Sequence, residues 1–218
     1  MVEIEFLGPI RMNNLKLEAA NLSEVKEKLG EYAQLSEWLK ICAVAVNDEI
    51  ASSLDAPLKT VIKFPFYRQF AEAEMQIFEG SLDAKAITNA WYDEFKDKNC
   101  GALITFTGIV REEGGISALS FDIYEPILRK WLAGWEQKAK DLGAYVLFAH
   151  SRGDVPVHES SYVAGVVSPQ RKVALQLINE FVEDFKANAP IWKYDVVGGE
   201  RIYAKERSQA IKGAGLLG

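Results

Sequence analysis

The strongest constraint on the fold is a break in the pattern of the chain after residue 66. Residues 64–80 read FPFYRQFAEAEMQIFEG, and the stretch from 67 to 74 is mostly polar, lacks apolar periodicity and contains no glycine. The patterns on its two sides differ, and a chain of 218 residues is long enough for two small domains. We therefore expect a domain at 1–66, a linker at 67–74 and a second domain at 75–218, in preference to a loop inside one domain.

The first half is typical of a small α+β roll. Apolar and acidic residues alternate over residues 2–6, as in a half-buried strand. Asn21 followed by Glu24 indicates a helix start of the capping-box kind, and apolar residues on one face continue the helix to about residue 32. Three more strands are expected at 15–17, 42–47 and 60–66.

The second half also mixes helices and strands. Apolar residues recur on one helical face in 84–95, from Pro126 to about Trp135, and from Val173 to about residue 187. Strands are expected at 100–110, 119–123, 144–150 and 160–167. The order of these elements predicts the α+β class.

Composition excludes several classes of function. The net charge of −6 argues against general binding to nucleic acid or to anionic membranes. The N-terminus does not resemble a secretory signal, and no apolar run approaches a membrane span. Cys42 and Cys100 lack metal-ligand spacing and are interpreted as buried free thiols. A cytoplasmic protein without nucleic-acid or membrane partners is expected.

Candidate chemistry rests on cations, because the common phosphate-loop, dinucleotide, zinc-protease and hydrolase motifs are absent. Arg111 follows a strand, Arg171 stands at the entry of a helix, and two lysines, Lys186 and Lys193, flank a helix end. Strand ends and helix entries are common anion sites, and a cation at a helix N-terminus adds to the positive field there. With two histidines, a metal site built from imidazole is not expected.

Each cation also has a structural interpretation. Lys186 can complement a helix dipole, Lys193 can extend past Trp192 to solvent, and Arg111 can pair with a neighbouring glutamate. His150 at a strand end is interpreted as structural when taken by itself. The residues alone thus lead to an anion-binding α+β enzyme or binding protein.

Longer motifs carry a family resemblance. GALITFTGIVR (101–111), LSFDIYEPI (119–127), SPQRKVA (168–174) and FKANAPIWKYD (185–195) make residues 75–218 similar to the large, catalytic subunit of molybdopterin synthase. EIEFLGPI (3–10), the helix at 22–32 and CAVAVNDEI (42–50) resemble the small, ubiquitin-like sulfur carrier of the same enzyme. The resemblance implies an N-terminal β-grasp (ubiquitin-like) domain fused to an α/β hammerhead-type catalytic domain.

The resemblance also implies a reaction, in which the family adds two sulfur atoms to cyclic pyranopterin monophosphate to form molybdopterin. The sulfur comes from a thiocarboxylate at the terminal Gly-Gly of the small carrier, and no bound cofactor or metal is implied. By motif position, the catalytic lysines are Lys186 and Lys193, and the substrate-binding residues are Arg111, Arg171, His150 and Asp195. The family's large subunits dimerise, so a homodimer is expected, with an arginine contributed across the interface.

The chain departs from the family pattern at several positions. Gln170 stands where a histidine is usual, and Ser151 where an arginine is usual, with Arg152 one step later. The carrier-like half lacks the family's Asp-Gly-Asp turn and diglycine, and Gly-Gly pairs occur only at 114–115 and 198–199. We therefore expect a separate thiocarboxylated carrier to supply sulfur. The alternatives are a non-catalytic assembly or regulatory module whose carrier-like half occupies the docking site, and a shifted reading frame over residues 58–75.

Overall fold

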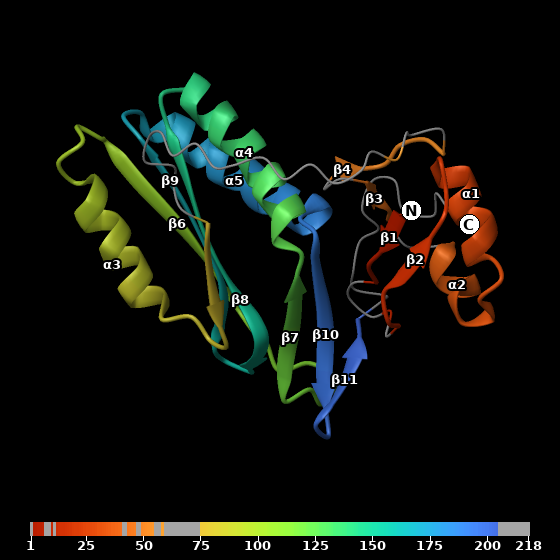
Figure 1. Ribbon diagram of the computed structural model, residues 1–218. Helices are drawn as coiled ribbons and strands as arrows, with labels where there is room; N and C mark the ends of the chain where they lie inside the picture. Colours follow the sequence, from red (N-terminus) through yellow and green to blue (C-terminus); the bar gives the residue numbers. More distant parts are fainter. Residues whose placement is uncertain are drawn as a thin grey trace. The chain divides into compact units, whose positions relative to one another are not determined.

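A computed structural model describes residues 2–6, 10, 12–40, 43–46, 49–54, 58 and 75–204 (Figure 1). These residues fall into two compact units, one within 2–58 and one within 75–204. The strand expected at 60–66, the linker expected at 67–74 and Cys42 lie outside the described residues. The domain bounds 1–66, 67–74 and 75–218 stay a prediction.

The first unit contains short elements around a small apolar core. Strand β1 (Val2–Ile4) pairs antiparallel with β2 (Leu15–Leu17), and β3 (Ala45–Val46) pairs antiparallel with β4 (Glu49–Ile50). The helical elements are α1 (Leu22–Leu29), the 3-10 turn η1 (Ala33–Leu35) and α2 (Ser36–Leu39). The strands and helices agree with the expected mixture, while the β-grasp topology stays a prediction.

The start of α1 confirms the capping prediction. The Asn21 side chain accepts a hydrogen bond from the Glu24 amide at 3.0 Å, and Glu24 Oε2 accepts one from the Ala20 amide at 2.9 Å. The first contact satisfies an amide of the first helical turn, which has no partner within the helix, and the second holds the amide just before the N-cap. The helix ends three residues before the expected bound, at Leu29, with Gly30 as its C-cap.

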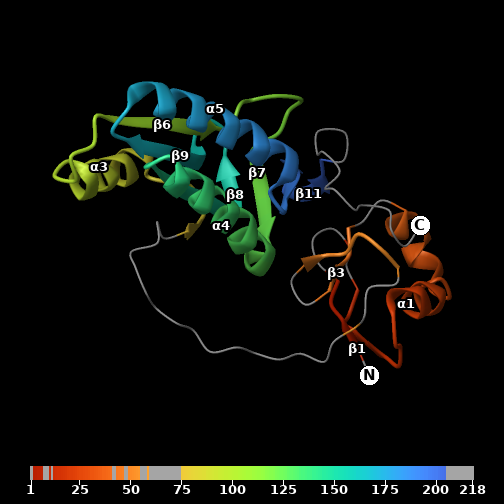
Figure 2. The same cartoon turned by 90° about the horizontal axis from the view of Figure 1, so that it is seen from above.

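The second unit is built on a seven-stranded sheet with the order β11-β10-β7-β8-β9-β6, to which β5 adds by pairing with β8. All pairs are antiparallel except β5 with β8. The strands are β5 (Gln76–Glu79), β6 (Ala102–Ile109), β7 (Ala118–Ile123), β8 (Tyr145–Pro156), β9 (Ser160–Ser168), β10 (Ile191–Val197) and β11 (Glu200–Tyr203). The helices are α3 (Ala84–Phe95), α4 (Glu125–Asp141) and α5 (Arg171–Asn188), and α5 runs along β6 and β9 (Figure 2).

Strands β8 and β9 are covered on both faces, because side chains on a strand alternate between the faces. One face packs on α4 and α5 through Val146, Phe148, Tyr162, Ala164 and Val166. The opposite face packs on α3 through Leu147, Ala149, Val163 and Val167. This two-sided burial explains why every residue of β9 is buried. The centre of the sheet is thus buried between α3 on one face and α4 with α5 on the other.

The structure corrects several expectations. The expected strand 144–150 continues to Pro156, where its second half pairs with β7. Strands β5, β10 and β11 were not expected; β5 and β11 have four residues each, and β10 begins directly after Pro190. Cys100 is free but partly exposed, because it lies in the connection before β6. No helix among the described residues is long and apolar enough to cross a membrane.

Candidate functional site

Two predicted catalytic lysines lie on either side of the turn that joins α5 to β10. Lys186 is in the last turn of α5, exposed, with its Nζ 3.4 Å from Glu183 Oε1. Lys193 is the third residue of β10 and lies directly opposite Phe121 of β7. The α5–β10 turn thus places both lysines near the same end of the helix.

Cross-strand pairing shows which face of the sheet carries Lys193 and Asp195. Residues directly opposite each other in an antiparallel pair project to the same face, so Lys193 lies with Phe121 and Asp195 with Leu119. The Phe121 ring contacts His150 at 5.0 Å between ring centroids, and His150 contacts Phe185 of α5 at 5.4 Å. This face is therefore the one on which α5 packs.

His150 is buried beneath this site, with 2% of its surface exposed. Its ring lies among Phe121, Phe148, Tyr162 and Phe185, and its Nδ1–H donates to the Ser151 carbonyl oxygen at 2.7 Å. Burial lowers the pKa of His150 from 6.5 to about 4, although the bond to Ser151 acts in the opposite direction. The imidazole is neutral at pH 7, and the cationic groups of the site are the lysines and arginines.

Arg111 lies at the same end of the sheet as Phe121. It follows Val110, which packs with Phe121, Ile116 and Val155 in one buried cluster. The Arg111 side chain is 79% exposed and pairs with Glu113 at 2.6 Å. An exposed pair of this kind contributes little to stability, so the guanidinium can exchange Glu113 for another anion at low cost.

Arg171 lies at the opposite end of α5. It is the first residue of the helix and is exposed, and its N-cap, Gln170, makes no side-chain capping bond. Fifteen residues separate Arg171 from Lys186, which corresponds to about 22 Å along a helix. Lys186, Lys193 and Asp195 therefore lie around and beyond the α5–β10 turn, while Arg171 lies at the far end of α5. Arg111 is connected to this face only through Val110, which packs with Phe121, the cross-strand neighbour of Lys193.

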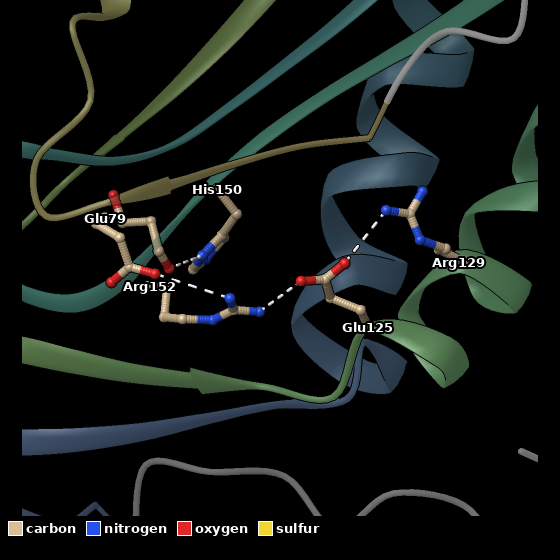
Figure 3. A network of polar contacts seen from close by, with 6 residues as sticks. Glu79, Glu125, Arg129, His150 and Arg152 are labelled. Carbon is tan, nitrogen blue, oxygen red and sulfur yellow. Dashed lines mark hydrogen bonds and ion pairs between the residues drawn. The ribbon is translucent and has the colours of Figure 1, made fainter.

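An ionic network next to His150 was not expected from the sequence (Figure 3). Arg152 Nη2 donates to Glu125 Oε1 at 2.7 Å, and its Nη1 lies 3.7 Å from Glu79 Oε1. Arg129 contacts the other oxygen of Glu125 at 3.2 Å. The hydrogen bond from Arg152, followed by that from Arg129, holds the pKa of Glu125 below its ordinary value against the effect of burial. Arg152 therefore joins β8, β5 and the start of α4, and two carboxylates already engage its guanidinium.

The side chains that could ligate a metal ion are scattered over the described part of the chain. Within it, no three His, Cys, Asp or Glu side chains lie close enough together to hold a metal ion. The described groups of the site are ammonium, guanidinium, carboxylate and neutral imidazole. Such groups can bind anions and stabilise charge that develops during a reaction.

Comparison with known proteins shows the family of this chain. The family model described as MoaE protein matches residues 79–188. The molybdopterin synthase catalytic subunit of Helicobacter pylori strain 26695 is 50% identical over 143 residues, which cover 66% of this chain and 99% of that protein. The subunit of the same name from Dictyostelium discoideum is 32% identical, over 55% of this chain and 77% of that protein.

Solved structures agree with the sequence relatives. A complex of subunits 1 and 2 of the molybdopterin-converting factor from Helicobacter pylori 26695 contains a chain that is 50% identical, with a TM-score of 0.65 over 66% of this chain and 99% of that one. Molybdopterin synthase from Staphylococcus aureus is 25% identical, with a TM-score of 0.52 over 59% of this chain and 95% of that one. The matched family model includes Arg111, Arg171 and Lys186. By its sequence and by the fold of its second unit, this chain belongs to the MoaE protein family, whose named relatives are catalytic subunits of molybdopterin synthase.

Proposed function

We propose that this protein is a molybdopterin synthase that transfers sulfur from a carrier thiocarboxylate to cyclic pyranopterin monophosphate, forming the dithiolene of molybdopterin. The observation that carries the proposal is the placement of Lys186 and Lys193 about the α5–β10 turn, on the sheet face that α5 covers, in a chain of the MoaE family. Both reactants are anions, a phosphate ester and a thiocarboxylate. A cationic site is what such a reaction requires.

Each residue has a role that follows from its position. Lys186 and Lys193 stabilise the charge that develops during sulfur transfer and exchange protons with the reacting groups. Arg111 gives up its exposed contact with Glu113 to bind the pterin phosphate, for which a guanidinium can supply two parallel hydrogen bonds. Asp195 lies on the same face as Lys193 and orients the substrate. His150 supports the site from below as a neutral, buried group.

Arg171 completes the site from a second copy of the chain. Its distance from Lys186 along α5 argues against joint contact with one small substrate inside a single chain. A symmetric dimer supplies the same residue from the partner, since both copies contribute the same surface. The proposal therefore includes a homodimer with the phosphate held by Arg111 of one chain and Arg171 of the other.

The sulfur donor is a separate thiocarboxylated carrier. The carrier-like half of this chain runs through 67–74 into the catalytic half and offers no diglycine there. One of the solved relatives is a complex of two different subunits. A carrier that docks from outside is consistent with both observations.

A reconstituted reaction tests the proposal. The purified chain is mixed with cyclic pyranopterin monophosphate and a thiocarboxylated small carrier, and mass spectrometry measures the pterin species that has gained two sulfur atoms. We expect this product with the carrier present and none without it. No product above that of a Lys186→Ala variant would contradict the proposed activity and favour a non-catalytic role.

A further inference from the structure

A carboxylate between α4 and α5 accepts hydrogen bonds from two tryptophans. Trp131 and Trp135 lie one turn apart on α4, and each indole Nε1–H donates to Asp184 Oδ2 at 2.7 Å. The Asn188 side-chain amide donates to Asp184 Oδ1 at 2.6 Å. Both carboxylate oxygens are therefore used. The two indole bonds attach α4 to the end of α5, and the bond from Asn188 lies within α5.

Trp131 also packs against aromatic rings of α5, which in turn contact the sheet. Trp131 stacks on Phe181 with ring centroids 5.3 Å apart and meets Phe185 edge-on at 6.0 Å. Phe185 in turn stacks on Tyr162 at 4.1 Å. Offset and edge-on contacts between aromatic rings restrict their relative orientation. The last turn of α5 is therefore held both by polar bonds to α4 and by ring contacts to the sheet.

Asp184 is ionised in this arrangement. Burial acts to raise its pKa, but hydrogen bonds from Trp135, Asn188 and Trp131 outweigh burial, so the pKa lies below its ordinary value. Hydrogen bonds to a charged acceptor are stronger than those between neutral groups. A neutral side chain at position 184 would therefore hold the helix end less firmly.

The position of this attachment relates it to the lysines. Asp184 precedes Lys186 by two residues, and Asn188 follows Lys186 by two residues, shortly before β10 and Lys193. Lys186 itself makes an exposed ion pair with Glu183 at 3.4 Å, which is too weak to hold the side chain by itself. The backbone of the last helical turn must therefore set where Lys186 lies.

We propose that Asp184, held by Trp131 and Trp135, is a positioning residue for Lys186. The inference rests on the proposed sulfur-transfer function, in which Lys186 reacts at one end of α5. The geometry of a reacting group affects the rate steeply, and a displacement of about 1 Å can cost about a hundredfold.

A kinetic comparison tests the proposal, with a matched control on the same two helices. Glu180 also contacts α4 from α5, through Lys138 Nζ at 2.6 Å, but lies one turn farther from Lys186. We expect Asp184→Ala to lower kcat about tenfold to a hundredfold while KM for the pterin changes less than about twofold. We expect Glu180→Ala to change both constants less than about twofold. Equal losses of kcat in the two variants would overturn the proposal.

A conservative variant keeps the test decisive if Asp184→Ala does not fold. Asp184→Asn keeps the side-chain volume and one oxygen that can accept from the indoles, but it loses the charge. We expect a decrease in kcat of about threefold to tenfold, between those of the wild type and the alanine variant. A kcat equal to that of the wild type would contradict the role of the carboxylate.

A spectroscopic readout separates positioning from activity. Lysines labelled with ¹³C-dimethyl groups give separate NMR signals, and Lys186→Arg identifies the signal of Lys186. We expect this signal to shift or broaden in both Asp184 variants and to stay unchanged in Glu180→Ala. An unchanged Lys186 signal in the Asp184 variants overturns the positioning role. If the signal moves but the wild-type chain makes no product, the positioning holds and the proposed function fails.

Discussion

The two ends of α5 both carry cations of the predicted site, but they are built differently. The C-terminal end, with Lys186, is attached to α4 through Asp184 and to the aromatic layer through Phe185. The N-terminal end, with Arg171, is exposed and has no side-chain cap. The end of α5 that carries Lys186, the lysine end, is thus held by contacts within its own chain. The end that carries Arg171, the arginine end, is exposed.

The largest expected effect on activity comes from removing the Lys186 side chain at the lysine end of α5. Lys186→Ala should lower kcat by about a hundredfold to ten-thousandfold, the range that a general acid or base contributes. Stability should change little, because the side chain is 57% exposed and its ion pair with Glu183 is weak. Product formation and the free energy of unfolding are measured on the same preparation.

Lys140→Ala is the matched control for this prediction. Lys140 is also an exposed lysine in the last turn of a helix, α4, so it controls for the loss of a favourable helix-dipole contact. Its kcat should stay within about twofold of the wild-type value. If Lys140→Ala lost as much activity as Lys186→Ala, the result would contradict a specific catalytic role of Lys186.

Arg171→Ala should have the next largest effect, seen mainly in substrate binding. Loss of a guanidinium that binds phosphate should raise KM for the pterin about tenfold or more, while Arg171→Lys should recover part of the loss by keeping the charge. Substrate titrations of both variants measure this. If Arg171→Ala has the same KM for the pterin as the wild type, Arg171 does not bind the substrate.

The stability of the protein should decrease in acid because of His150, which is buried beside the lysine end of α5. Because burial lowers the pKa of His150 to about 4, the unfolded chain binds more protons than the folded chain between pH 6.5 and 4. The free energy of unfolding should therefore fall as the pH is lowered through this window, by up to about 3 kcal/mol from His150 alone.

His150→Phe separates this contribution from that of the carboxylates. The substitution removes the titrating group and places a ring among aromatic neighbours. Urea unfolding at pH 6.5 and pH 4.5, followed by tryptophan fluorescence, should show a smaller pH dependence in the variant. Equal pH dependence in both proteins would contradict the assignment.

The smallest expected effect is a gain in stability from adding an N-cap at the arginine end of α5. Gln170 has the extended backbone of an N-cap, with φ −115° and ψ 119°, but its side chain makes no capping bond. Gln170→Ser should stabilise the protein by about 0.5–1 kcal/mol, because a serine hydroxyl can accept from an amide of the first turn. Gln170→Ala, which cannot cap, is the control, and unfolding in urea measures both. A serine variant no more stable than the alanine variant would show that water already satisfies these amides equally well.

The sequence predicts the helices of the second unit better than its sheet. A helix can be predicted from apolar residues spaced three or four positions apart. Ile87, Trp91 and Phe95 have this spacing, and they are the buried residues of α3. The pairing of β10 with β7 joins residues about 70 positions apart and cannot be obtained from local pattern. That pairing is what places Lys193 opposite Phe121.

The candidate site shows the same difference between what local sequence predicts and what only the fold brings together. Motif resemblance is the source of the six predicted site residues, which stay a prediction. It noted Arg152 only as an arginine displaced by one position, and it did not identify Asp184. The partners of both residues lie on other elements and are brought near only by the fold. The spacing of Trp131 and Trp135, four residues apart, was the one local signal, since both indoles then point from one helical face.

The central claim is that the lysine end acts in its own chain while the arginine end serves a partner. Mixing Arg171→Ala chains with Lys186→Ala chains, under conditions that exchange subunits, tests it directly. The pterin is supplied well below its KM for Arg171→Ala, so that both separate variants have low activity. Each mixed dimer would contain one site with both residues intact, so random pairing should restore about a quarter of wild-type activity. Activity that stays at the level of the separate variants would contradict the account, because both residues would then have to act within one chain.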